Sequence, residues 1–204
     1  MSASQVQLPE ADLKGSVTLE AAIGGRRSCR AFSDSPLSLR ELGQVLWAAQ
    51  GVTGRGGRRR AVPSAGGLYP LETFVAVGEG TVEGLAAGVY RYVPQEHALE
   101  PSLEGDVRRQ VAAAALSQDF LARAPADILI AADYARTAVR YAERATRYVD
   151  MEAGHVGQNV SLQAEALGLG TVMVGAFRDE AVARVFQLPE RLSPLYLMPV
   201  GHPR

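Results

Sequence analysis

The chain has 204 residues, with 21 basic and 22 acidic side chains and a formal net charge of −1 at pH 7. This balance excludes a protein that attracts nucleic acid or anionic membranes through its overall charge. Cys29 is the only cysteine, which excludes an intrachain disulfide and a thiolate zinc site. The three histidines have no metal-binding spacing, so no metal site is expected.

The N-terminal sequence lacks both the basic region and the apolar region of a signal peptide. No apolar run approaches the roughly 20 residues that a membrane-spanning helix needs. We therefore expect a cytoplasmic protein without membrane or nucleic-acid partners. The polar residues 1–17 are expected to form a flexible arm, followed by a single domain over residues 18–204.

The first half of the chain predicts two helices and one strand. Thr18 is a plausible N-cap for a short helix over residues 18–25. Ser38, with Glu41 three residues later, indicates a capping box for a helix that ends at Gly51. A glycine-arginine loop (52–60) and a small-residue loop (63–70) come next, before an alternating strand at 71–77.

The second half mixes helices with apolar strands. Its expected elements are a hairpin around Pro94–His97, a helix within 105–116, a buried strand at 126–133, one long helix from about 136 to 167, a strand at 170–177, a short helix at 179–186 and a last strand at 194–201. Long helices with a handful of strands predict an α+β sandwich.

Three side chains near the start of the domain suggest a binding site for an anion. Arg26, Ser28 and Arg30 occupy alternate positions, so an extended segment would point all three the same way. Two guanidinium groups and a hydroxyl suit the oxygens of a phosphate. The alternative is a solvated basic turn that pairs with Asp34 or Glu20.

Polar side chains also recur along the expected long helix, at Tyr148, Glu152, His155 and Asn159. Because unsatisfied buried polar groups are costly, they need partners. Those partners are either one another, in a structural network, or a bound polar ligand.

Four segments, in this order, resemble the nitroreductase family of FMN-dependent oxidoreductases: "RRSCRAF", "PSAGGLYPLETFVAV", "EAGHVGQNVSLQAEALGLGTVMVGAF" and "LYLMPVGHP". The segments "SAGGLYPLE", "GVYRY" and "YAERATRYVDMEAGH" resemble the SagB-type branch, which includes dehydrogenases that oxidise azoline rings in peptides. The resemblance implies a sandwich with a mostly antiparallel sheet, a homodimer, and FMN at the subunit interface.

The resemblance also implies a set of cofactor-binding residues. Arg26, Ser28 and Arg30, with Arg27 beside them, would hold the FMN phosphate. The remaining residues would contact the flavin or its ribityl chain: Pro63, Ser64, Ala65, Gly66 and Gly67 from the partner subunit, and Gln118, Met173, Val174, Gly175 and Ala176. Beyond the last strand only Arg204 could add a further charge to the phosphate site.

The implied activity is electron transfer from NAD(P)H through flavin N5 to a small organic acceptor. Azoline dehydrogenation is the alternative, and there the branch uses a Lys-Tyr pair. The matching dipeptide is Arg140-Tyr141, in which arginine is a poor base and only Tyr141 could contribute. Further alternatives are a flavin-binding module without turnover and RNA binding through Arg55 and Arg58–Arg60.

Overall fold

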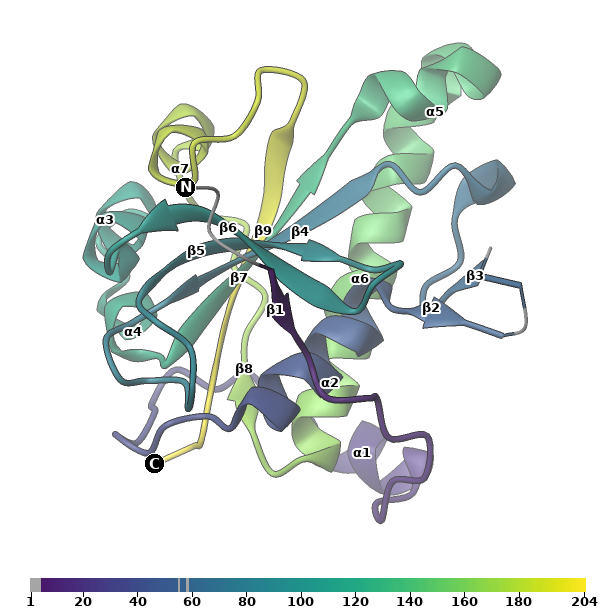
Figure 1. Cartoon of the computed structure of the whole chain (residues 1–204). Coiled ribbons are helices and arrows are strands. Elements are labelled where there is room, and N and C mark those ends of the chain that lie inside the picture. Colours follow the sequence, from purple (N-terminus) through teal and green to yellow (C-terminus); the bar gives the residue numbers. More distant parts are fainter. Residues whose placement is uncertain (1–4, 55, 58) are drawn as a thin grey trace.

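The computed structural model describes residues 5–54, 56–57 and 59–204. A seven-stranded sheet in the order β1-β6-β5-β4-β7-β9-β8 forms the centre of the molecule, with helices on both faces (Figure 1). Its strands are β1 (Val6–Gln7), β4 (Leu71–Val77), β5 (Gly88–Val93), β6 (Ala98–Glu104), β7 (Ala126–Ala132), β8 (Gly170–Thr171) and β9 (Ser193–Gly201). Neighbouring strands pair antiparallel, which confirms the predicted α+β sandwich.

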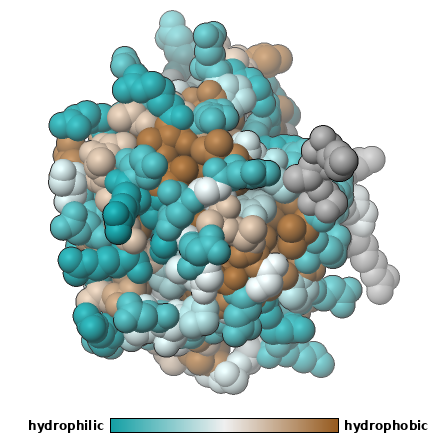
Figure 2. All heavy atoms as spheres, turned by 60° about the vertical axis from the view of Figure 1, so that its left-hand side comes forward, coloured by the Kyte–Doolittle hydropathy of each residue, from teal (hydrophilic) through white to brown (hydrophobic). Residues whose placement is uncertain are grey.

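Two apolar layers enclose the sheet because alternate side chains of each strand point to opposite faces. On β4, Val75 and Val77 join the layer beneath α2 (Leu39–Gln50) and α6 (Ala145–Ala166), while Phe74 joins the other. The second layer is covered by α3 (Arg108–Ala114), α4 (Asp119–Arg123) and α7 (Asp179–Val185). Figure 2 shows that apolar atoms on the outside of this second side form small patches among polar ones.

Both predicted N-caps are present. The Thr18 hydroxyl accepts a hydrogen bond from the Ala21 N–H at 3.2 Å, which opens α1 (Leu19–Gly25). At α2, Ser38 Oγ accepts from the backbone of Glu41, and the Glu41 carboxylate accepts from the backbone of Ser38 at 2.8 Å. Each cap satisfies helix-end N–H groups and stabilises its helix by about 1 kcal/mol.

The prediction of one continuous helix from 136 to 167 is wrong. The chain forms α5 (Tyr134–Tyr141), a 3₁₀ turn η2 (Ala142–Arg144) and then α6. Ala142 breaks the helix because its φ is +44°, outside the right-handed region. Tyr141 and Tyr148 pack edge to face across the break, with ring centroids 5.1 Å apart. The helix propensities of the residues in this segment do not predict that aromatic contact.

Three other segments differ from the sequence expectation. The strand expected at 170–177 ends at Thr171, and beyond it only Val174 pairs, through an isolated bridge to Leu197. The polar N-terminal segment supplies β1, which pairs with β6 at one edge of the sheet. The glycine-arginine loop contains β2 (Val52–Thr53) and β3 (Arg59–Arg60), while Arg55 and Arg58 lie outside the described residues.

The remaining predicted elements are confirmed with shifts of a few residues. The hairpin consists of β5 and β6, and the predicted strands at 71–77, 126–133 and 194–201 are β4, β7 and β9. Within the described part of the chain, no helix is both long and apolar enough to cross a bilayer.

Candidate functional site

The arginine-rich segment is held between β8 and the C-terminal residues. The Cys29 N–H donates to the Thr171 carbonyl at 2.9 Å, and the Ser33 N–H donates to the His202 carbonyl at 2.9 Å. The Arg204 N–H donates to the Ala31 carbonyl at 3.1 Å. These backbone bonds place Arg204, as the sequence suggested, beside the segment that carries the three other arginines.

The charges of this segment are not neutralised by nearby carboxylates. Arg26 is half-buried, whereas Arg27, Ser28, Arg30 and Arg204 are exposed. None of these four arginines forms a salt bridge within the described ranges, so the pairing with Asp34 or Glu20 is not observed. The segment therefore presents guanidinium and hydroxyl donors that suit an anionic ligand.

Residues 118–120 connect this segment with the turn that follows β8. The Arg30 guanidinium carbon lies 5.8 Å from the centre of the Phe120 ring. The Gln118 side-chain nitrogen donates to the carbonyls of Ala176 and Ala115, at 2.8 Å each. The structure thus brings Gln118 to the predicted site, with its side-chain nitrogen engaged by backbone. Phe120 was not predicted, because no sequence motif marks it.

The turn after β8 combines anchored and free backbone groups. Val174 is buried and exchanges two hydrogen bonds with Leu197, each 2.9 Å long. Gly175 and Ala176 are exposed, and their N–H groups donate no hydrogen bond to the described residues. Met173 is 36% exposed and lies over Gly157 of α6. The N–H groups of Gly175 and Ala176 are therefore available to a ligand, whereas that of Val174 is not.

The loop 63–67 contains the short 3₁₀ helix η1 (Ala65–Gly67) and rests against the end of α5. Gly66 has φ +62°, and a Cβ there would lie 2.9 Å from the Tyr141 hydroxyl oxygen and 3.0 Å from an Arg140 guanidinium nitrogen. Pro63, Gly66 and Gly67 are exposed. The structure thus places Tyr141 directly beside the predicted flavin-contacting loop.

Beneath this loop lies a buried carboxylate. Glu152 of α6 is 2% exposed, and its Oε1 atom has no hydrogen-bond partner among the described residues. Burial raises the pKa of Glu152 to about 7, an effect that neighbouring Ser64, Arg60 and Gln50 offset only in part. The Ser64 hydroxyl oxygen itself accepts from the Tyr69 N–H at 2.9 Å. The loop is therefore supported by a group that titrates near neutral pH.

Helix α6 separates the two groups of predicted site residues within one chain. The loop 63–67 meets this helix at Glu152, whereas the turn at Met173 meets it at Gly157. Five helical residues correspond to a rotation of about 140° around the axis. Glu165, which contacts Gly25 beside the arginine segment, lies about two helical turns beyond Gly157 and about 20 Å along the axis from Glu152. One chain alone does not bring the two groups together.

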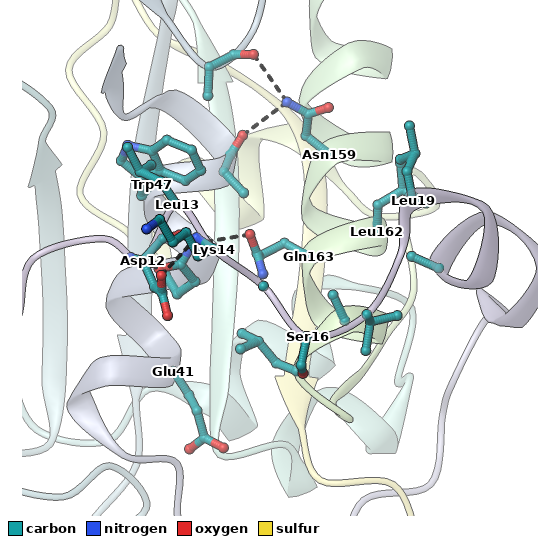
Figure 3. A pocket seen from close by; sticks show the side chains of 18 of the residues that line it. Asp12, Leu13, Lys14, Ser16, Leu19, Glu41, Trp47, Asn159, Leu162 and Gln163 are labelled. Carbon is teal, nitrogen blue, oxygen red and sulfur yellow. Dashed lines mark hydrogen bonds between the residues drawn. The ribbon is translucent and has the colours of Figure 1, made fainter. Parts of the chain in front are cut away.

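A cavity of about 750 Å³ opens elsewhere, between the N-terminal segment, α2 and α6 (Figure 3). None of the predicted cofactor residues lines it. Two of its polar side chains have protein partners: the Asn159 side-chain nitrogen donates to the Ala48 and Ala61 carbonyls at 3.2 Å, and that of Gln44 donates to Gln163 Oε1 at 3.2 Å. Asn159 therefore fits the alternative in which the polar side chains of this helix form a structural network. Glu152 differs, because its Oε1 atom has no hydrogen-bond partner among the described residues.

Within the described ranges, no group of three His, Cys, Asp or Glu side chains is arranged to hold a metal ion.

The Nitroreductase family model matches residues 23–202. A Methanocaldococcus jannaschii protein named "Putative nitroreductase" is 47% identical over 197 residues, which cover 97% of this chain and 96% of that protein. A solved structure of a nitroreductase homologue from Ralstonia eutropha superposes with a TM-score of 0.85 at 30% identity, covering 98% of this chain and 90% of the other.

The Escherichia coli microcin B17-processing protein McbC is 30% identical over 171 residues, or 81% of this chain and 62% of McbC. This match agrees with the resemblance to the SagB-type branch. The sheet order, the arrangement of the arginine segment and the extent of these similarities lead to one conclusion: the chain belongs to the nitroreductase family of oxidoreductases.

Proposed function

We propose that the protein is an FMN-dependent oxidoreductase that passes electrons from NAD(P)H to a small organic acceptor. The observation that carries this proposal is the cluster of unpaired donors on Arg26, Ser28 and Arg30 beside Arg204. In this arrangement the guanidinium groups bind the FMN phosphate with forked hydrogen bonds. Arg27 adds a further positive charge next to them.

The surrounding residues fit a flat ligand attached to such a phosphate. The free N–H groups of Gly175 and Ala176 can hydrogen-bond to the edge of a flavin ring, and Met173 offers an apolar surface beside them. Bound FMN would supply the hydride chemistry at its N5 atom. The protein's own residues bind the phosphate, orient the ring and provide fixed N–H dipoles.

A second copy of the chain would complete the site. Since α6 keeps the loop 63–67 away from the arginine segment, we propose a homodimer in which Pro63, Ser64, Ala65, Gly66 and Gly67 reach the flavin of the other subunit. Exposed apolar side chains on α1 and α6 are available to such an interface: Leu19 is 61%, Ile23 56% and Met151 47% exposed. The cavity in Figure 3 is lined by the neighbouring parts of α1, α2 and α6.

Azoline dehydrogenation is a second candidate, favoured by the position of Tyr141. Its hydroxyl lies against Gly66, so it accompanies the loop that would contact the flavin. Arginine is a poor base, so proton removal from an azoline ring would fall to Tyr141. McbC, the microcin-processing relative, supports this candidate by similarity.

The test is a visible spectrum of the protein purified without added flavin, followed by anaerobic addition of NADH or NADPH. We expect an FMN spectrum that bleaches with at least one of them. An FMN spectrum that bleaches only with an azoline-containing peptide would favour the dehydrogenase. Bound FMN that no reductant bleaches would indicate a flavin-binding module without turnover, and a protein that takes up no FMN would overturn the proposal.

A further inference from the structure

The segment that crosses from α5 to α6 carries an unusual excess of positive charge. Residues 134–148 contain four arginines, at 136, 140, 144 and 147, and a single acidic residue, Glu143. The whole chain, by contrast, has a net charge of −1. The excess is therefore local to this helix-turn-helix segment, which stands at the end of α6 next to the label α5 in Figure 1.

Among these four arginines, only Arg136 forms hydrogen bonds or ion pairs with the described residues. Arg136 donates to the Tyr69 carbonyl at 2.8 Å and to the Glu72 carboxylate at 3.0 Å. Arg140, Arg144 and Arg147 are exposed and form no salt bridge with any described residue. Asp150, the next acidic residue along α6, accepts a hydrogen bond from the Tyr134 hydroxyl at 2.6 Å. Three guanidinium groups thus remain open to solvent.

Aromatic rings lie among these arginines. Tyr141 and Tyr148 are half-buried and meet edge to face at 5.1 Å, and the Arg140 guanidinium carbon lies 5.6 Å from the centre of the Tyr141 ring. Arg144 precedes Tyr148 by four residues, a spacing that places both side chains on one face of a helix. The surface formed by Arg140, Tyr141, Arg144, Arg147 and Tyr148 is called the arginine-tyrosine surface below.

This surface adjoins the loop predicted to contact the flavin. Arg140 and Tyr141 both pack against Gly66, and the remaining members extend from them over the break at Ala142. Guanidinium groups bind phosphate, sulfonate and carboxylate oxygens in forked geometry, and tyrosine faces pack against planar rings. A molecule that approaches the flavin along this side would contact both the guanidinium groups and the tyrosine rings.

We propose that the arginine-tyrosine surface binds an anionic group on the molecule that reacts at the flavin, so that the protein selects phosphorylated or otherwise anionic planar substrates over neutral ones. The proposal rests on the proposed flavin chemistry for its location. The anion could belong to the reductant, as the 2′-phosphate of NADPH, or to the electron acceptor. The shared chemistry is an oxyanion on an aromatic or conjugated molecule.

The first experiment measures binding without turnover. Adenosine 2′,5′-bisphosphate is compared with 5′-AMP, and 1,2-naphthoquinone-4-sulfonate with 1,2-naphthoquinone, by calorimetry on the wild-type protein. The same titrations use the Arg144→Gln/Arg147→Gln variant. Arg184→Gln is the matched control, because Arg184 is an exposed arginine on α7, on the other side of the sheet, with a weak 3.7 Å ion pair to Glu180.

We expect at least one anionic probe to bind about tenfold more tightly than its partner, and the double variant alone to lose this preference. The loss should also appear as a weaker dependence of affinity on salt concentration. Equal affinity within both pairs, or a preference that survives in the double variant, would overturn the proposal.

Steady-state kinetics then identify the source of the anion. If the Arg144→Gln/Arg147→Gln variant loses about tenfold in kcat/KM for NADPH while its kcat/KM for NADH is unchanged, the anionic group belongs to the reductant. A fall confined to the sulfonated quinone assigns it to the acceptor. If the anionic probe binds as expected but neither NADH nor NADPH reduces the flavin, the proposal of NAD(P)H-dependent reduction fails and the binding proposal stands.

Discussion

Gly66 and Tyr141 are in direct contact: a methyl group on Gly66 would lie 2.9 Å from the tyrosine hydroxyl oxygen. Real Cβ atoms are almost never this close to a heavy atom, so any other residue at position 66 must displace Tyr141 or the loop. Gly67, the next residue, has a similar φ of +66° but no atom within 4 Å of its Cβ position. Comparing substitutions at the two glycines therefore separates the effect of backbone strain from the effect of contact with Tyr141.

Gly66→Ala and Gly67→Ala should both destabilise the chain by about 1 kcal/mol through their left-handed backbone. Only Gly66→Ala should also shift the loop against Tyr141, and we expect its FMN affinity to be about tenfold weaker than that of Gly67→Ala. Fluorescence titration with FMN and urea unfolding measure the two effects. If both variants bind FMN as tightly as the wild type, the loop does not approach the flavin.

Arg30→Gln should weaken binding of FMN by about tenfold, because one charged hydrogen-bond donor to the phosphate is lost. Riboflavin, which lacks the phosphate, should bind the variant and the wild type equally. Arg123→Gln is the control, since Arg123 is an exposed arginine on α4 outside the segment. An equal loss of FMN and riboflavin would instead indicate that Arg30 supports the ring or the fold.

The buried carboxylate of Glu152 should make stability fall as the pH rises. The pKa of Glu152 in the folded chain, about 7, is above its ordinary value of 4.5. The stabilisation is therefore complete below pH 4.5 and is lost as the pH rises through 7. Glu152→Gln should remove this dependence and raise the free energy of unfolding at pH 8 by up to about 3 kcal/mol.

Urea unfolding of the flavin-free protein at pH 5 and pH 8 measures this difference. Glu180→Gln serves as the control because the Glu180 side chain is 93% exposed and should leave the pH dependence unchanged. A Glu152→Gln variant with the wild-type pH dependence would show that Glu152 is ionised in the folded chain at pH 5.

Gly154 and Gly157 of α6 offer a matched pair of substitutions. A Cβ on Gly154 meets nothing within 4 Å, whereas one on Gly157 collides with the Met173 sulfur. Gly154→Ala should therefore stabilise the helix by up to about 1 kcal/mol. Gly157→Ala should move Met173 and alter the visible absorption spectrum of bound FMN. Unchanged flavin spectra in both variants would place Met173 away from the ring.

Local sequence signals predicted the fold well where one short segment determines the structure. The caps at Thr18 and Ser38, the hairpin around Pro94–His97 and the apolar strand β7 all follow from residues a few positions apart. The break at Ala142 does not, because alanine is a good helix former and nothing in the local sequence marks the positive φ that Ala142 adopts.

The candidate site could be predicted only in part for a similar reason. Spacing alone suggested that Arg26, Ser28 and Arg30 bind an anion, which stays a prediction. The family resemblance added Arg204, whose backbone N–H donates to the Ala31 carbonyl of the same segment. The contact of Arg30 with Phe120 and the support of Ser64 by Glu152 join residues about 90 positions apart. No local pattern encodes such pairs, so only the folded chain reveals them.

The position of α6 between the arginine segment and the loop 63–67 has a genetic consequence. In the proposed dimer, each flavin depends on the arginine segment of one copy and on the loop of the other. Co-expression of Arg30→Gln with Gly66→Ala chains should therefore yield mixed dimers in which one site carries both defects and the other carries none. Activity should recover toward half of the wild-type value per mixed dimer, a complementation between two alleles that are each impaired alone.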